Sequence, residues 1–187
     1  MPAHGLRVHG GEARGRPLVA PPGIRPSQGM VKEAIFNAVS AVLEGAVVID
    51  LCAGSGALGI EALSRGAARA HFVDQGDRQV ATIRRNLERL GYEDRATVDR
   101  ADAARWLEAH PAEVGEADLV LLDPPYADAV VDRVLAGLDH MVPDRAVVVV
   151  EHEQGRVLPP LERLAEVRRR RYGDSEVSLM EVREEDE

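Results

Sequence analysis

Asp50-Leu51-Cys52-Ala53-Gly54-Ser55-Gly56-Ala57-Leu58-Gly59 is the segment from which the architecture of this 187-residue chain is most directly inferred. It follows an apolar run and precedes a helical pattern, and its glycines have the spacing G-x-G-x-x-G. Asp74 stands twenty residues after Gly54. Glycines let the backbone approach a ligand closely, and an acid at the end of the next strand accepts hydrogen bonds from ribose hydroxyls. The segment therefore predicts the nucleotide-binding loop of an α/β protein.

Short apolar runs alternate with amphipathic helical patterns on both sides of this loop. Strands are expected at residues 46–51, 69–73, 96–98, 118–122 and 146–150, and helices at residues 57–65, 77–90 and 103–109 and from Asp128 onward. Residues 167–172 and 177–182 are expected to pair through a turn at Gly173-Asp174. The pattern predicts a mostly parallel sheet with helices on both faces, closed by an antiparallel hairpin.

The chain is expected to form a single domain, residues 1–187. Residues 10–25, rich in glycine and proline, indicate a short hairpin or loop, and Ser27 is a plausible cap for the helix that follows. We expect an N-terminal extension over residues 1–44, a catalytic core over residues 45–184 and a frayed acidic tail over residues 185–187.

Composition restricts the class of protein. Hydrophobic residues make up 45% and charged residues 29%, as in ordinary globular proteins, and a single cysteine, Cys52, excludes an intramolecular disulfide. The first residues lack the apolar core of a signal peptide, which favours a cytoplasmic location and no membrane partner. The net charge of −9 argues against binding nucleic acid by bulk charge, but residues 1–37 carry a local excess of basic side chains. The candidates for contact with an anionic partner there are Arg7, Arg14, Arg16, Arg25 and Lys32.

Three acids stand where parallel strands are expected to end: Asp50, Asp74 and Asp123. Ligands of open parallel sheets bind at that edge, so three acids in register indicate a site. The loop alone does not distinguish a pyrophosphate from a carboxylate. Asp50 favours a ligand with a cationic ammonium group, which S-adenosylmethionine carries and NAD does not. Asp102-Ala103, after the third strand, is placed to contact an adenine edge, although a lone Asp there also suits a helix cap.

The fourth strand ends in Asp123-Pro124-Pro125-Tyr126. The prolines stiffen the turn and have no N–H to donate, so their carbonyls are free to accept. A planar exocyclic amine needs two acceptors in its plane, which the Asp123 carboxylate and the Pro124 carbonyl would supply. Tyr126 can stack on a nucleobase. The motif suits methyl transfer to an amine of a flipped or single-stranded base.

With these motifs the chain resembles the class I S-adenosylmethionine-dependent methyltransferases. It is more closely similar to the RsmD family, the bacterial 16S ribosomal RNA guanine-N2 methyltransferases. The resemblance spans residues 8–16 (VHGGEARGR), 25–27, 31–37, 50–64, 123–126 and 172–175. It implies a Rossmann-like fold with a seven-stranded sheet, and methylation of the N2 amine of a guanine in small-subunit ribosomal RNA, either free or in a small ribosomal subunit particle.

The resemblance also implies roles for the matching residues. Catalytic roles fall to Asp123, Pro124 and Tyr126, and the cofactor S-adenosyl-L-methionine would be held by Asp50, Ala53, Gly54, Ser55, Gly56, Asp74, Gln75, Asp102 and Ala103. One feature departs from the family pattern: Gly29 and Met30 stand where the family usually has Asp-Arg.

Other functions remain open from sequence. The same turn serves methyl transfer to adenine N6 or cytosine N4 in DNA and to a protein glutamine; the glycine spacing also allows an NAD-dependent oxidoreductase. A non-catalytic RNA-binding module would not need the cofactor loop. No metal site is expected, because the six histidines lack ligand spacing and are interpreted as surface or loop residues. Residues 168–171, four arginines on one expected strand, favour edge protection over RNA contact.

Overall fold

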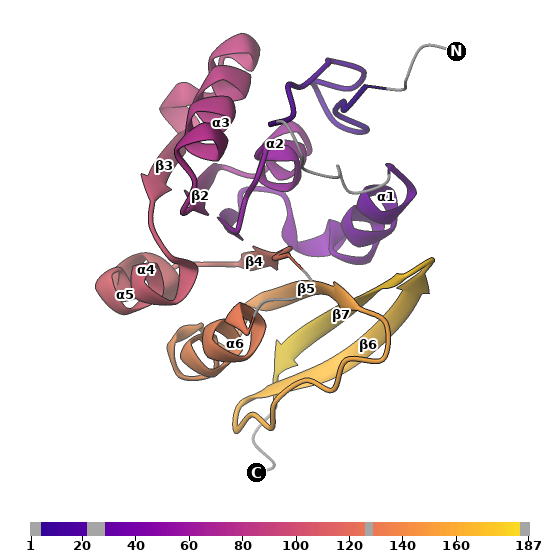
Figure 1. Cartoon of the computed structure of the whole chain (residues 1–187), viewed down its shortest axis with the longest axis vertical. Helices are drawn as coiled ribbons and strands as arrows, with labels where there is room; N and C mark the ends of the chain where they lie inside the picture. Colours follow the sequence, from indigo (N-terminus) through magenta and orange to yellow (C-terminus); the bar gives the residue numbers. More distant parts are fainter. Residues whose placement is uncertain (1–4, 22–28, 126–128, 184–187) are drawn as a thin grey trace.

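The computed structural model describes residues 5–21, 29–125 and 129–183. Its strands are β1 (Val47–Leu51), β2 (Arg69–Asp74), β3 (Ala96–Arg100), β4 (Leu119–Leu122), β5 (Val147–Glu153), β6 (Leu164–Tyr172) and β7 (Ser175–Val182). They form one sheet in the order β3-β2-β1-β4-β5-β7-β6 (Figure 1). Strands β1 to β5 are parallel, and β7 pairs antiparallel with both β5 and β6. The predicted parallel sheet with a C-terminal antiparallel hairpin is confirmed.

Helices cover both faces of the sheet. They are α1 (Gly29–Ala38), α2 (Ala57–Ser64), α3 (Asp77–Leu90), α4 (Ala103–Ala109), α5 (Pro111–Gly115) and α6 (Val130–Met141), with short 3-10 turns η1 (Ser40–Val42) and η2 (Glu93–Arg95). Buried side chains of α1, α2 and α3 share one core cluster, and those of α4, α5 and α6 share the other. The chain therefore winds outward from β1 in both directions, which places the switch in strand order between β1 and β4.

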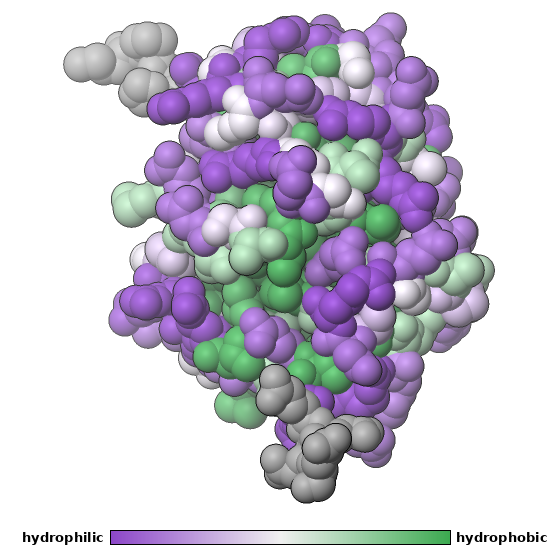
Figure 2. Space-filling view, turned by 180° about the vertical axis from the view of Figure 1, so that it is seen from behind, coloured by the Kyte–Doolittle hydropathy of each residue, from purple (hydrophilic) through white to green (hydrophobic). Residues whose placement is uncertain are grey.

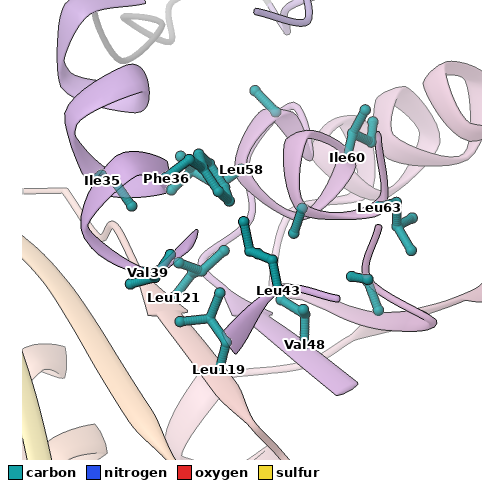
Figure 3. Close-up of a cluster of buried hydrophobic side chains, with 14 of the residues drawn as sticks. Ile35, Phe36, Val39, Leu43, Val48, Leu58, Ile60, Leu63, Leu119 and Leu121 are labelled. Carbon is teal, nitrogen blue, oxygen red and sulfur yellow. The ribbon is translucent and has the colours of Figure 1, made fainter. Parts of the chain in front are cut away.

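The core on the α1–α2 face explains how the loop after β1 is positioned. Phe36 and Val39 from the α1 region and Leu58 and Ile60 from α2 pack together over the sheet (Figure 3). Leu121 of β4 lies in the same cluster. Helix α2 is buried along its whole length, so its first turn is held rigidly above the carboxyl ends of β1 and β4.

The N-terminal segment, residues 5–21, is a hairpin-like loop docked on α2 and α3. Arg7 and Pro17 form an isolated antiparallel bridge, and the amides of His9 and Gly10 donate to the Glu61 carboxylate at 2.8 and 2.7 Å. Because Glu61 is completely buried, the hairpin is fixed to α2 rather than extended into solvent. The division into an extension over residues 1–44 and a core over residues 45–184 stays a prediction.

Several element limits differ from expectation. Helix α5 was not predicted; it begins at Pro111, and proline is well placed in the first turn of a helix. Strand β5 continues to Glu153 because β7 pairs with it as far as Ser175. The predicted caps Ser27 and Asp128, and the expected acidic tail over residues 185–187, lie outside the described residues.

The face of the molecule seen from behind carries mainly hydrophilic residues (Figure 2). The view from behind shows a hydrophobic area near the middle of that face (Figure 2). The most exposed large hydrophobic side chains of the described residues are Met30, Val157 and Val167. None of the helices in the described ranges has the length and apolar character needed to cross a membrane.

Candidate active site at the carboxyl ends of β1, β2 and β4

The sheet register brings the three predicted acids together. Asp50 on β1 lies level with Phe72 of β2 and Leu121 of β4. Asp74 and Asp123 therefore stand two residues further along the two flanking strands. Both carboxylates are close enough to Asp50 to affect its titration. The expected convergence at the switch point is what the structure shows.

Asp50 lies beneath the loop rather than on its surface. It is 1% exposed, and its Oδ2 accepts a hydrogen bond from the Gly59 amide of α2 at 2.8 Å. Burial raises the pKa of Asp50 to about 8, against the lowering effect of the Gly59 hydrogen bond and with further raising by Asp123 and Asp74. Asp50 thus anchors the first turn of α2. Its predicted contact with a cofactor ammonium group stays a prediction.

Asp74 joins the glycine loop after β1 to the turn that follows β2. Its Oδ2 accepts from the Gly54 amide and its Oδ1 from the Gly76 amide, each at 2.9 Å. The side chain is only partly buried. An ionised carboxylate has about four lone-pair sites, so two remain for an incoming hydroxyl pair.

The loop itself is built from left-handed residues. Cys52, Gly54 and Gly56 have φ of 58°, 59° and 78°. A non-glycine residue in this region is uncommon and marks a backbone that its surroundings hold in place. The surroundings here include Asp74 and a residue that sequence reasoning missed, Asn86 of α3.

Asn86 connects the loop to the N-terminal hairpin. Its side chain is fully buried, and its Nδ2 donates to the Ser55 carbonyl at 2.9 Å and to the Val19 carbonyl at 2.8 Å. Its Oδ1 accepts from the Val19 amide at 2.8 Å. The signal that could have identified it is an amide side chain beside the apolar positions Ile83 and Leu87 of an amphipathic helix.

The remaining predicted cofactor residues line the same edge. Asp102 caps α4 by accepting from the Arg105 amide at 3.1 Å, and Arg133 Nη2 lies 3.4 Å from its other carboxylate oxygen. The cap role that sequence allowed for Asp102 is therefore present. Ala103 is buried and Gln75 is exposed; Ala53 is partly buried.

The predicted amine-binding turn is described in part. Asp123 is partly buried, Pro124 is buried and Pro125 is exposed. Asp123 follows Leu122 directly, so it sits beside the loop after β1. Tyr126 lies outside the described residues.

Comparison with known proteins shows which family has this sequence and fold. The family model described as Conserved hypothetical protein 95 matches residues 6–181. The Escherichia coli K12 protein named ribosomal RNA small subunit methyltransferase D is 36% identical over 160 residues, covering 82% of this chain and 78% of its own. The chain belongs to the RsmD family of methyltransferases.

Solved structures agree with this membership. The structure of an Escherichia coli protein named methyltransferase yhhF superposes with a TM-score of 0.82 at 31% identity, and the match covers 95% of this chain and 97% of that one. An RNA methyltransferase from Salinibacter ruber, solved with S-adenosyl-L-homocysteine, has the same fold with a TM-score of 0.68 at 22% identity, covering 87% and 97%. The fold of this RsmD-family chain is that of the class I methyltransferases.

The five N-terminal basic residues predicted to contact an anionic partner differ in their exposure in this RsmD-family chain. Arg7, Arg14 and Arg16 are exposed, and Arg16 donates to the Arg89 carbonyl at 2.8 Å. Arg25 lies outside the described residues.

Lys32 corrects the prediction of RNA contact. It is 0% exposed, and its amine donates to the Arg7 carbonyl at 2.8 Å and lies 4.0 Å from the Glu61 carboxylate. Burial lowers the pKa of Lys32, with Glu61 opposing that effect. Its amine cannot reach an RNA phosphate in this fold, because the hairpin and α2 enclose it.

The Gly29-Met30 departure from the family pattern has a visible local setting. A side chain added at Gly29 would meet the His9 ring at 2.8 Å, whereas Met30 is 72% exposed.

Within the described residues no group of three His, Cys, Asp or Glu side chains is arranged to hold a metal ion. The interpretation of all histidines as surface or loop residues is wrong for His152, which lies in β5, is 2% exposed and contacts Ser178 Oγ at 2.8 Å.

Proposed function

We propose that this chain transfers a methyl group from S-adenosyl-L-methionine to the exocyclic N2 amine of a guanine in small-subunit ribosomal RNA. The observation that carries the proposal is the convergence of Asp50, Asp74 and Asp123 at the switch point of the sheet. Methylation of ribosomal RNA, without regard to which base or atom is modified, is supported by the name of the Escherichia coli relative.

The residues at the switch point fit this cofactor better than a dinucleotide. Asp74 and Asp123 form an acidic edge, and both raise the pKa of Asp50, which lies beneath the loop. A pyrophosphate placed there would be repelled, whereas a sulfonium and an ammonium group would be attracted. Asp74 would accept from the two ribose hydroxyls with the lone pairs that Gly54 and Gly76 leave free. Asp102 and Ala103 would flank the adenine.

The amine-binding part rests on Asp123 and the carbonyl of Pro124. Together they would accept from the two N–H groups of one amine and fix its plane. The methyl donor supplies an activated methyl group on positively charged sulfur. Orienting the amine for in-line attack supplies most of the rate. The N–C bond would form as the C–S bond of the donor breaks, with S-adenosyl-L-homocysteine as the leaving group. The Asp123 carboxylate would stabilise the positive charge on the tetrahedral nitrogen until its extra proton is lost to water. Tyr126 would stack on the base.

The proposed choice of RNA as substrate and of guanine N2 as the methylated atom is supported by other observations than the proposed reaction. The exposed Arg7, Arg14 and Arg16 of the docked hairpin supply a cationic surface despite the net charge of −9. The N2 position rests on the resemblance of residues 8–16 and of Tyr172-Gly173-Asp174-Ser175 to the family. Amines of DNA bases and protein glutamine are the competing acceptors.

The decisive experiment is mass mapping of modified nucleosides in ribosomal RNA from cells with and without this protein. We expect one N2-methylguanine of the small-subunit RNA to disappear on deletion and to return with the wild-type gene but not with Asp123→Ala. An unchanged map of ribosomal RNA would reject the proposal. If the modification disappears as expected, methyl transfer by the purified protein is measured on free transcript and on unmodified small subunits. The comparison identifies which form is the substrate.

A further inference from the structure

We propose that one face of β6, carrying Arg168 and Arg170, binds the phosphate backbone of the RNA on the same side of the sheet as the docked hairpin. This inference rests on the proposed function and extends it by assigning a second RNA-binding surface. It gives the arginine run a role beyond protection of an edge strand.

Among the described residues, Arg169, on one face of β6, is paired with acids, whereas Arg168 and Arg170, on the other face, are not. Arg169 binds Glu166 and Glu176 at 2.6 and 3.2 Å and donates to the Arg156 carbonyl, so its charge is already compensated. Arg168 and Arg170 are exposed, and their side chains have no hydrogen bond or ion pair with any described residue. Two uncompensated positive charges on one strand face favour an anionic partner.

A β-bulge in β6 determines on which face of the sheet Arg168 and Arg170 lie. The register shifts between Glu166 and Arg168, so Val167 is the extra residue. After the shift, Arg168 pairs with Leu179 and Arg170 with Val177. Directly paired residues of antiparallel strands point to the same face. Bulges commonly re-aim side chains near functional sites.

That face is the one on which the site and the docked hairpin lie. Val177 and Leu179 belong to the core cluster of α1 and α2, which also contains Leu6 and Val8 of the hairpin. In Figure 1, α1 lies between the N-terminal segment and the β6–β7 hairpin. The free arginines of β6 and the exposed arginines of the N-terminal hairpin therefore flank one side of the molecule.

The register also places Arg170 level with the proposed amine site. Arg170 pairs with Val177, and Val177 pairs with Glu151, which follows the partner of Leu122 on β5. Asp123 follows Leu122, so the two lie at the same height along the sheet. Three strand spacings of about 4.8 Å separate β4 from β6, or about 14 Å in all. An RNA strand with one base at Asp123 can reach Arg170 with a phosphate a few nucleotides away.

Adjacent residues provide a matched test. Arg170→Gln and Arg171→Gln each remove one exposed charge, from opposite faces of one strand; Arg171 otherwise donates only to the Gly173 carbonyl. Binding to a small-subunit ribosomal RNA transcript is measured against salt concentration. Each lost phosphate contact reduces the slope of log affinity against log salt by about 0.7 to 0.9. We expect that loss for Arg170→Gln, twice that loss for Arg168→Gln/Arg170→Gln, and no change for Arg171→Gln.

Further readouts separate the possible failures. S-adenosyl-L-homocysteine affinity should stay within twofold in every variant, which shows that the fold is retained. Equal slope losses for Arg170→Gln and Arg171→Gln, or no loss in either, would overturn the inference. Aggregation of the Arg168/Arg170 variant without a slope change would leave edge protection as the role. Weaker binding to small subunits with an unchanged transcript slope would indicate a protein partner and also overturn it. A wild-type protein that neither binds nor methylates this RNA would defeat the proposed function itself.

Discussion

Asn86 donates its side-chain amide to the carbonyl oxygen of Ser55 at 2.9 Å, from inside α3 to the middle of the glycine loop. The same amide nitrogen donates to Val19, so one buried side chain joins the loop to the N-terminal hairpin. The loop conformation therefore depends on a buried residue outside the loop.

We expect Asn86→Ala to weaken both stability and cofactor binding. Leaving the Ser55 carbonyl unpaired in a buried setting costs about 1–3 kcal/mol. Calorimetric titration with S-adenosyl-L-homocysteine and urea unfolding measure the two effects. Thr82→Ala, at a half-buried position of the same helix whose hydroxyl donates, among the described residues, only to the Arg78 carbonyl, is the control and should change stability by less than about 0.5 kcal/mol. Equal behaviour of the two variants would show that the Asn86 contact is unimportant.

Asp74→Ala is expected to reduce cofactor affinity more strongly. Charge-assisted hydrogen bonds to a ribose contribute about 1.5–3 kcal/mol, which corresponds to roughly a tenfold to 150-fold loss. Asp77→Ala, an exposed acid three residues further on, is the matched control. Unchanged calorimetric affinity in Asp74→Ala would remove this residue from the site.

Asp123→Ala is expected to separate binding from chemistry. Cofactor affinity should stay within a few-fold, while single-turnover methyl transfer falls by about a hundredfold to a thousandfold. Asp123→Asn tests the charge, since its amide oxygen still accepts but is neutral. Activity close to that of Ala would assign the role to the charge, and activity close to wild type would assign it to acceptance alone. Rapid turnover by the Ala variant would exclude the proposed amine site.

Asp50 should make stability depend on pH. Its folded pKa of about 8 lies above the unfolded value of about 4, so the folded state binds the extra proton between these values. This contribution is complete below pH 4 and is lost as the pH rises through 8. Asp50→Asn keeps an acceptor for the Gly59 amide without the charge. The melting temperature of the variant relative to wild type should therefore rise from pH 5 to pH 8; parallel curves would contradict the assignment.

The docked hairpin should contribute to RNA binding through its exposed arginines. Arg14→Gln/Arg16→Gln should flatten the salt dependence of RNA affinity by about 0.7 to 0.9 per contact. Arg105→Gln on the exposed side of α4, across the sheet, serves as a control. An equal slope in the double variant and wild type would show that the hairpin does not contact RNA.

Local sequence signals predicted much of this structure because they act over a few residues. Gly91 ends α3 in the left-handed conformation, and residues 103–109 form the expected helix. The strand-end acids could be predicted because parallel register aligns them. Burial of Lys32 against Glu61 could not be predicted, because it depends on a hairpin folding over α2. The bulge after Glu166 was equally hidden, since it follows from pairing with β7.

The docking of residues 5–21 sets an order of events during synthesis. His9 emerges from the ribosome 52 residues before its partner Glu61. Val19 emerges 67 residues before its partner Asn86. The hairpin amides can thus be satisfied only after α2 and most of α3 have left the exit tunnel. The start of the chain is consequently among the last parts to acquire its native contacts, and completion of the cofactor loop is delayed with it.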